Sequence, residues 1–110
     1  MKPVYVAFVT KRLEQEFEQL ACARHEDRQL YVAISDAIGK LKQDPCCGVK
    51  VAKRLWPSNY VREYGVTNLW KYNLPNTWRL IYTIAGDEVR IMNVILDWFD
   101  HKEYERKFKY

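Results

Sequence analysis

Alternating apolar and polar residues in the C-terminal half of the chain predict three consecutive strands. Residues 69–74 alternate large apolar and polar side chains with a period of two, which is typical of a half-buried strand. Residues 78–84 are rich in β-branched and aromatic side chains, and residues 88–96 form the next such stretch. The breaks at residues 75–77 and at Gly86-Asp87 predict tight turns. The stretch therefore predicts a three-stranded antiparallel meander.

The register of this meander follows from the pattern, because residues opposite each other in a ladder point to the same face. On one face, Asn73 lies opposite Arg79 and Lys71 lies opposite Ile81. A two-residue second turn adds Arg90, Met92 and Val94 to this basic, partly apolar face and places Arg79 near Val94. The face is either an ordinary solvated surface or a binding site. Six large side chains share the other face, which we predict to be core: Trp70, Tyr72, Leu74, Trp78, Leu80 and Tyr82.

The N-terminal half predicts a strand and two amphipathic helices. Residues 4–9 form a short apolar run that fits a strand, and Thr10 is a suitable cap for a helix that follows. From position 11 the apolar residues recur with a helical period, and a second helical stripe covers residues 27–43. Asp44-Pro45 ends the second helix. The two stripes need an apolar partner, which the core face of the meander provides.

Two shorter segments complete the chain. Residues 49–68 predict an ordered loop in which Pro57 is able to start a helical turn and Gly65 to end it. This loop either forms one wall of a groove or merely covers the edge of the sheet. Asp100 is a good cap for a short C-terminal helix, which carries on one side Tyr104 and Phe108.

Length and composition indicate one domain spanning residues 1–110. The chain is long enough to bury a core of its own. Hydrophobic residues make up 48% of it, yet no apolar run approaches the roughly 20 residues needed to cross a bilayer. The first residues lack the pattern of a signal peptide, so we expect a cytoplasmic protein without membrane contact. Cys22, Cys46 and Cys47 are not spaced as metal ligands, so we expect free thiols and no metal site.

Positive charge is concentrated in the second half of the chain. Residues 1–49 hold seven basic and seven acidic residues, whereas residues 50–110 hold eleven basic and seven acidic residues. Basic residues bind phosphates and exposed aromatic side chains stack on unpaired bases, which makes single-stranded RNA a plausible ligand. Because the predicted register buries Trp70, Tyr72 and Trp78, the aromatic residues left to stack on bases are Trp56, Tyr60 and Tyr64.

Three motifs in the second half resemble the RelE/ParE toxin superfamily. They are the strand at residues 69–74, the Trp-Arg-Leu-Ile-Tyr strand at residues 78–82, and the Asp-His-Lys-Glu-Tyr stretch at residues 100–104. The first half agrees with the family in the order of its elements. The resemblance implies an α+β domain of about this length, built from a strand, a two-helix hairpin, a three-stranded antiparallel meander and, in this chain, a short C-terminal helix.

The resemblance also implies a reaction. RelE-like toxins cleave messenger RNA on the ribosome through attack of a 2′-hydroxyl on the neighbouring phosphate, which needs no metal or other cofactor. Here it implies that Arg79 binds the phosphate, that Lys71 holds the backbone, and that Tyr104 or His101 transfers protons. An alternative interpretation of Tyr104, of equal weight, is that its side chain packs the C-terminal segment against the rest of the protein. The candidate RNA-binding residues are Lys53, Arg54, Arg62, Asn73, Arg90 and Lys102.

The implied partners are ribosome-bound messenger RNA and a cognate acidic antitoxin. The antitoxin would cover an apolar strip formed by Met92, Val94 and Leu96, unless the C-terminal helix of the chain itself covers it. One position departs from the family pattern, because Asn73 stands where the best-known nuclease has a second lysine. This departure keeps open a non-toxic relative that binds RNA or protein, and a ParE-like gyrase inhibitor stays open because it shares the fold.

Overall fold

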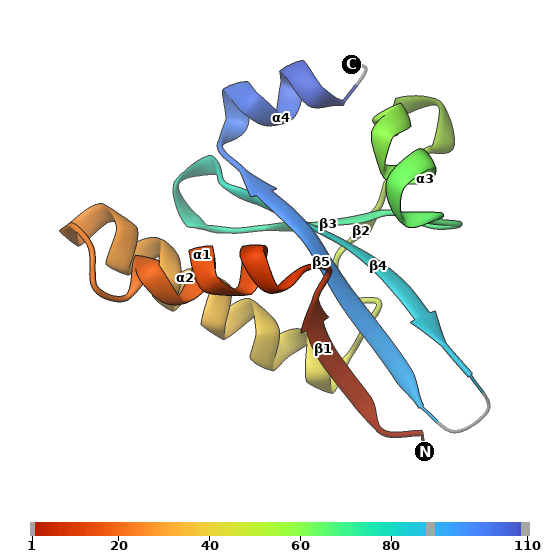
Figure 1. Cartoon of the computed structure of the whole chain (residues 1–110), viewed down its shortest axis with the longest axis horizontal. Coiled ribbons are helices and arrows are strands. Elements are labelled where there is room, and N and C mark those ends of the chain that lie inside the picture. Colours follow the sequence, from red (N-terminus) through yellow and green to blue (C-terminus); the bar gives the residue numbers. More distant parts are fainter. Residues whose placement is uncertain (1, 88–89, 109–110) are drawn as a thin grey trace.

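The described residues form a mixed α+β structure around one five-stranded sheet. The computed structural model describes residues 2–87 and 90–108, and the strand order is β1-β5-β4-β3-β2 (Figure 1). The strands are β1 (Val4–Phe8), β2 (Val49–Lys50), β3 (Trp70–Asn73), β4 (Arg79–Gly86) and β5 (Ile91–Phe99). The helices are α1 (Lys11–Leu20), α2 (His25–Gln43), α3 (Ser58–Tyr64) and α4 (His101–Lys107), with short 3-10 turns η1 (Lys53–Leu55) and η2 (Pro75–Thr77).

The predicted register of the first hairpin is confirmed. Trp70 pairs with Tyr82, and at the other end of the ladder Asn73 pairs with Arg79. The turn η2 closes the hairpin, where the backbone N–H of Leu74 donates a hydrogen bond of 2.9 Å to the carbonyl oxygen of Trp78. Lys71 and Arg79 therefore lie on one face of the sheet, as the alternation of side chains requires.

The second hairpin differs from the prediction in two ways. The prediction of a two-residue turn at Gly86-Asp87 is wrong, because Gly86 still belongs to β4 and pairs with Ile91. The predicted third strand began at residues 88–89, which lie outside the described residues, and it ended at Leu96, whereas β5 continues to Phe99. A register shift opposite Ile81 and Tyr82 leaves Leu96 without a cross-strand partner, as in a β-bulge. Phe99, rather than Val94, consequently lies opposite Arg79.

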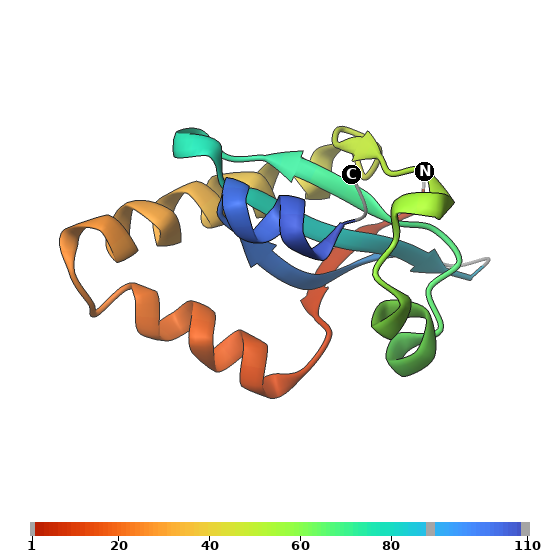
Figure 2. The ribbon, with the colours of Figure 1, turned by 90° about the horizontal axis from the view of Figure 1, so that it is seen from above.

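The helices α1 and α2 cover one face of the sheet, here called the helix-covered face (Figures 1 and 2). Thr10 caps α1 as predicted, since its hydroxyl accepts a hydrogen bond of 3.1 Å from the backbone N–H of Leu13. Helix α2 begins at His25, two residues earlier than predicted. Strand β1 pairs in parallel with β5 at the edge of the sheet. All six aromatic and aliphatic residues of the predicted core face belong to one hydrophobic cluster with residues of α1 and α2, which confirms that prediction.

The opposite face of the sheet, here called the second face, carries a second core. Its buried cluster joins Ile81, Leu96 and Phe99 of the sheet to residues of the 51–69 segment and of α4. The segment predicted as a loop contains β2, η1 and α3, and Gly65 ends α3 with a left-handed φ of 62°, as predicted. The rings of Tyr60 in α3 and of Phe108, the residue after α4, lie 6.2 Å apart.

This second core corrects the expectation that the aromatic residues of the segment stack on RNA bases. Trp56 is only 7% exposed and its indole N–H donates a hydrogen bond of 2.9 Å to the carbonyl oxygen of Val51. Tyr60 is only 3% exposed, while Tyr64 remains 38% exposed. The segment therefore covers the sheet, because its aromatic side chains close a core rather than face solvent.

Cys22, Cys46 and Cys47 are exposed and carry free thiols. No helix in the described part of the chain is long and apolar enough to cross a membrane.

Candidate functional site

Three residues that the sequence singled out meet on the second face of the sheet. Lys71 comes from β3, Arg79 from β4 and Tyr104 from α4. The Nζ atom of Lys71 lies 5.1 Å from the centroid of the Tyr104 ring, and the guanidinium carbon of Arg79 lies 5.9 Å from it. Both distances are within the range of cation–π attraction. Two cations from neighbouring strands are thus held against one aromatic ring.

Local structure explains this convergence. The pairing of Asn73 with Arg79 and of Lys71 with Ile81 puts both cations on the second face. The side chain of Asp100 caps α4 by accepting a hydrogen bond of 2.9 Å from the N–H of Glu103. The capped helix turns Tyr104 toward the sheet, where its ring stacks on that of Phe108 at 4.4 Å.

Among the described residues, the guanidinium of Arg79 has no acidic partner. Its Nη1 atom donates a hydrogen bond of 3.2 Å to the carbonyl oxygen of Trp78, and its Nε atom is buried without a hydrogen-bond partner. Within residues 2–87 and 90–108, no carboxylate forms an ion pair with Arg79. A buried unpaired donor is costly, and guanidinium groups bind carboxylate or phosphate in a bidentate manner. The geometry fits an anion-binding site.

Sequence reasoning missed a third cation, which lies on the ring of the cross-strand partner of Arg79. Lys107 lies on α4, and its Nζ atom is 5.9 Å from the ring centroid of Phe99, the cross-strand partner of Arg79. Lys107 follows Tyr104 by three positions, so both side chains occupy one side of the helix. That spacing was the available signal. Lys71, Arg79 and Lys107, on the rings of Tyr104 and Phe99, are called the cationic cluster below.

The two candidates for proton transfer lie in different surroundings. Tyr104 contacts both cations but is only 3% exposed. His101 lies on the exposed side of α4, where its Nε2 atom is 2.6 Å from Oε1 of Glu105 and pairs with it when protonated. The structure therefore places Tyr104 in the cationic cluster and pairs His101 with a neighbouring carboxylate.

The candidate RNA-binding residues are scattered. Asn73 is exposed and pairs with Arg79, so it borders the cationic cluster. Arg90 lies at the far end of the β4–β5 hairpin, 4.0 Å from a carboxylate oxygen of Asp87. The eight residues of β4 separate it from the cluster by roughly 25 Å at about 3.3 Å per residue, so Arg90 lies well away from Arg79. The remaining candidates are exposed on η1, α3 and α4: Lys53, Arg54, Arg62 and Lys102.

An unusual carboxyl group lies near the cluster. Burial raises the pKa of Asp97 to about 6, although the N–H of Trp98 and the charge of Lys107 lower it, and Glu16 adds to the rise. With Arg12, Glu16 and other residues, Asp97 lines a cavity of about 210 Å³. Sequence reasoning gave Asp97 no role, although a lone acidic residue in the apolar run from Ile95 to Phe99 was a signal.

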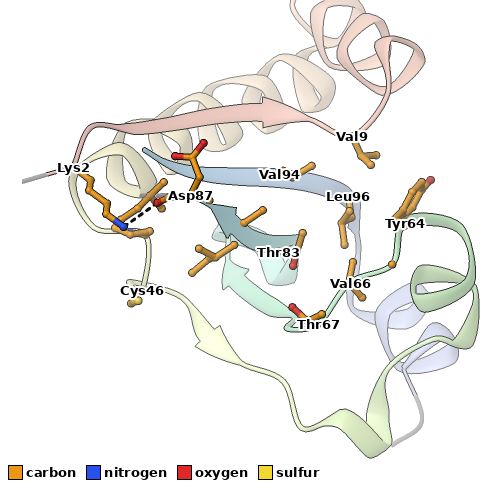
Figure 3. Close-up of a pocket in the computed structure, with 16 residues that line it drawn as sticks. Lys2, Val9, Cys46, Tyr64, Val66, Thr67, Thr83, Asp87, Val94 and Leu96 are labelled. Carbon is orange, nitrogen blue, oxygen red and sulfur yellow. Dashed lines mark hydrogen bonds between the residues drawn. The ribbon is translucent and has the colours of Figure 1, made fainter. Parts of the chain in front are cut away.

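A groove of about 750 Å³ lies farther along the second face (Figure 3). At one end the Nζ atom of Lys2 donates a hydrogen bond of 2.9 Å to the carbonyl oxygen of Asp87. Leu96, expected to lie open, is only 3% exposed because residues of α3 and α4 pack in its cluster, whereas Val94 remains partly exposed. The chain therefore covers part of the predicted apolar strip itself. Figure 3 labels the other groove residues Val9, Cys46, Tyr64, Val66, Thr67 and Thr83.

No known protein family, curated protein or solved structure matches this chain.

Proposed function

We propose that this protein is a RelE-like toxin that binds ribosome-bound messenger RNA and cleaves it without a metal ion. The observation that carries the proposal is the meeting of Lys71 and Arg79 on the Tyr104 ring. The buried Nε atom of Arg79, which has no hydrogen-bond partner among the described residues, supports it, since a guanidinium with an unused donor fits a phosphate. The choice of ribosome-bound RNA as the substrate, and of the cytoplasm as the location, rests on the resemblance of residues 69–74, 78–82 and 100–104 to the family.

The proposed chemistry assigns different tasks to the cluster residues. Attack of a 2′-hydroxyl on phosphorus adds negative charge to the phosphate oxygens, which Arg79 and Lys71 stabilise. The attacking hydroxyl must lose a proton and the leaving oxygen must gain one. Tyr104 is buried and His101 pairs with Glu105, so cleavage requires RNA binding to expose Tyr104 or to draw His101 away from that carboxylate.

A cognate antitoxin is the proposed protein partner. The groove on the second face is lined by apolar side chains that include Val94, and it leaves room for a partner segment. An acidic segment suits a chain with a net charge of +4, and the opposite charges would speed the encounter.

A second candidate function is binding without cleavage, by a ParE-like gyrase inhibitor or by a non-toxic relative. The burial of Tyr104 favours it, because a side chain that is 3% exposed serves packing well and proton transfer poorly. Asn73, in place of a second lysine, favours it too. In this case Arg79 and Lys71 bind an anionic partner and no bond is broken.

Expression in a bacterium without the antitoxin separates these functions. RelE-like cleavage arrests translation, gyrase inhibition arrests replication, and a non-toxic relative leaves growth unhindered. Mapping of the 5′ ends of cellular messages then shows whether cleavage occurs within translated codons. Arrested translation without new 5′ ends would contradict the nuclease and favour binding alone.

A further inference from the structure

The cationic cluster extends beyond the two strands that the sequence singled out. Phe99 lies opposite Arg79 in the β4–β5 ladder, and its ring supports the ammonium group of Lys107 at 5.9 Å. The Tyr104 ring supports the other two cations. The three charges thus follow each other from β3 across β4 to the last turn of α4.

Among the described residues Lys107 forms no ion pair, unlike its neighbour Arg106. The Nη2 atom of Arg106 lies 2.7 Å from both carboxylate oxygens of Glu103, so this charge is compensated within α4. No carboxylate in the part of the chain that the structure describes forms an ion pair with Lys107. The positive charge of Lys107 also acts on Asp97, whose pKa it lowers.

We propose that Lys107 is a third phosphate-binding residue, so that the RNA strand runs from β3 over β4 onto α4. The inference rests on the proposed function and specifies the path of the substrate. Lys71 and Arg79 hold the phosphate at the site of cleavage, and Lys107 binds an adjacent one. Lys107 therefore contributes to affinity, with little effect on the rate of the bound complex.

Two other roles of Lys107 give different outcomes. A basic residue in the last turn of a helix stabilises the helix dipole, and Lys42 occupies the same kind of position, exposed in the last turn of α2. Lys42→Gln is therefore the matched control. If Lys107 acts only as a counter-charge for Asp97, its replacement changes the pH dependence of stability and leaves the salt dependence of RNA binding unchanged.

The test measures binding of a fluorescent single-stranded oligoribonucleotide over a series of NaCl concentrations, with cleavage of ribosome-bound message and melting temperature in parallel. Neutralising one contact to a single strand lowers the slope of log K against log[salt] by about 0.7. We expect Lys107→Gln to show this change, with about three- to tenfold weaker binding at low salt and a raised KM at nearly unchanged kcat. Lys107→Arg retains the parental slope, as does Lys42→Gln.

The inference and the proposed function fail in different ways. If the parent binds and cleaves RNA while Lys107→Gln keeps its slope and KM, the inference is overturned and the proposed function stands. If the parent neither binds the oligonucleotide nor cleaves the message, the proposed function fails and the inference falls with it. An equal loss in Lys42→Gln would show a helix or net-charge effect and would also overturn the inference.

Discussion

Arg79 is the residue on which activity depends most under the proposed mechanism. It lies on the second face, so Arg79→Ala removes no apolar side chain from either buried cluster and should leave the cores intact. Loss of one charged donor to the developing oxyanion costs about 100- to 1,000-fold in rate. We expect this loss in cleavage of ribosome-bound message by the purified variant. A variant that melts at the parental temperature and cuts at the parental rate would show that the RNase proposal is wrong.

Tyr104 requires a more careful substitution, because its ring belongs to the second core. Tyr104→Ala would remove a side chain that is only 3% exposed and destabilise the protein by roughly 3 to 5 kcal/mol. Tyr104→Phe keeps the ring and the support of both cations. We expect it to reduce kcat less than Arg79→Ala does and to leave RNA affinity unchanged. An unchanged kcat would assign Tyr104 to packing.

Asp97 should make stability depend on pH. Its pKa is about 6 in the folded protein, against an ordinary value of 3.8. The folded state therefore holds this proton more tightly, and the associated stability is complete below about pH 4 and is lost as pH rises through about 6. Asp97→Asn avoids the loss, so we expect it to exceed the parent by on the order of 1 to 2 kcal/mol at pH 8 and to match it at pH 4. Urea unfolding at several pH values measures the difference, with the exposed Asp36→Asn as the charge control. A constant difference across this range would contradict the assignment.

At the scale of elements, β2 is short and depends on close approach to its neighbours. A side chain on Gly48 would place its Cβ atom 2.6 Å from the carbonyl oxygen of Lys71 and 2.6 Å from the hydroxyl of Tyr82. That hydroxyl accepts a hydrogen bond from the Gly48 N–H and donates one to the carbonyl oxygen of Pro45. Gly48→Ala should therefore cost about 1 to 3 kcal/mol, since the Lys71 backbone cannot yield without disturbing the sheet.

Gly39 provides the opposite control for this substitution. It lies inside α2, and a Cβ atom there meets nothing within 4 Å. Gly39→Ala should stabilise the protein by about 0.5 to 1 kcal/mol, because alanine loses less conformational entropy in a helix. Chemical denaturation of the two variants measures both changes in the free energy of unfolding, which we expect to have opposite signs. A stable Gly48→Ala variant would show that β2 does not need this approach.

The elements also show what the sequence could predict. The register of the first hairpin was predictable, because its alternation and the break at residues 75–77 allow one register, although β4 continues to Gly86. The second was not, because Gly86-Asp87 imitates a tight turn, and the bulge at Leu96 changes the phase of the alternation. Burial of Trp56 and Tyr60 was also hidden, since an irregular segment has no period that reveals its inner side.

The candidate site was predictable to a similar extent and for similar reasons. Lys71 and Arg79 share a face through the register of β3 and β4, so their neighbourhood followed from the pattern. The contact of Lys71 and Arg79 with Tyr104 depends on how α4 packs on the sheet. The family resemblance implied this position of Tyr104, whereas the periodicity of the sequence did not. Lys107 escaped notice because a lysine at a helix C-terminus already has an ordinary explanation in the helix dipole.

At the scale of the whole molecule, the groove and the cationic cluster lie on the same face but at different ends. Strand β5 joins them, running from Ile91 beside the groove to Phe99 in the cluster. Its nine residues span on the order of 30 Å at about 3.3 Å per residue. An antitoxin that fills the groove and also blocks Arg79 therefore needs on the order of ten extended residues in contact with this face.

This arrangement predicts that partner binding and RNA cleavage respond to different substitutions. Val94 lines the groove and is partly exposed, so Val94→Asp should place a charge against the acidic segment of the proposed antitoxin. We expect it to abolish copurification with the proposed antitoxin, sought as the product of an adjacent gene, while cleavage persists. Arg79→Ala should do the reverse. Val32, which is 56% exposed on α2, does not line the groove, and Val32→Asp is the matched control. If Val94→Asp still copurifies with that product as the parent does, the partner does not occupy the groove; if the parent copurifies with no such product, the antitoxin proposal itself is wrong.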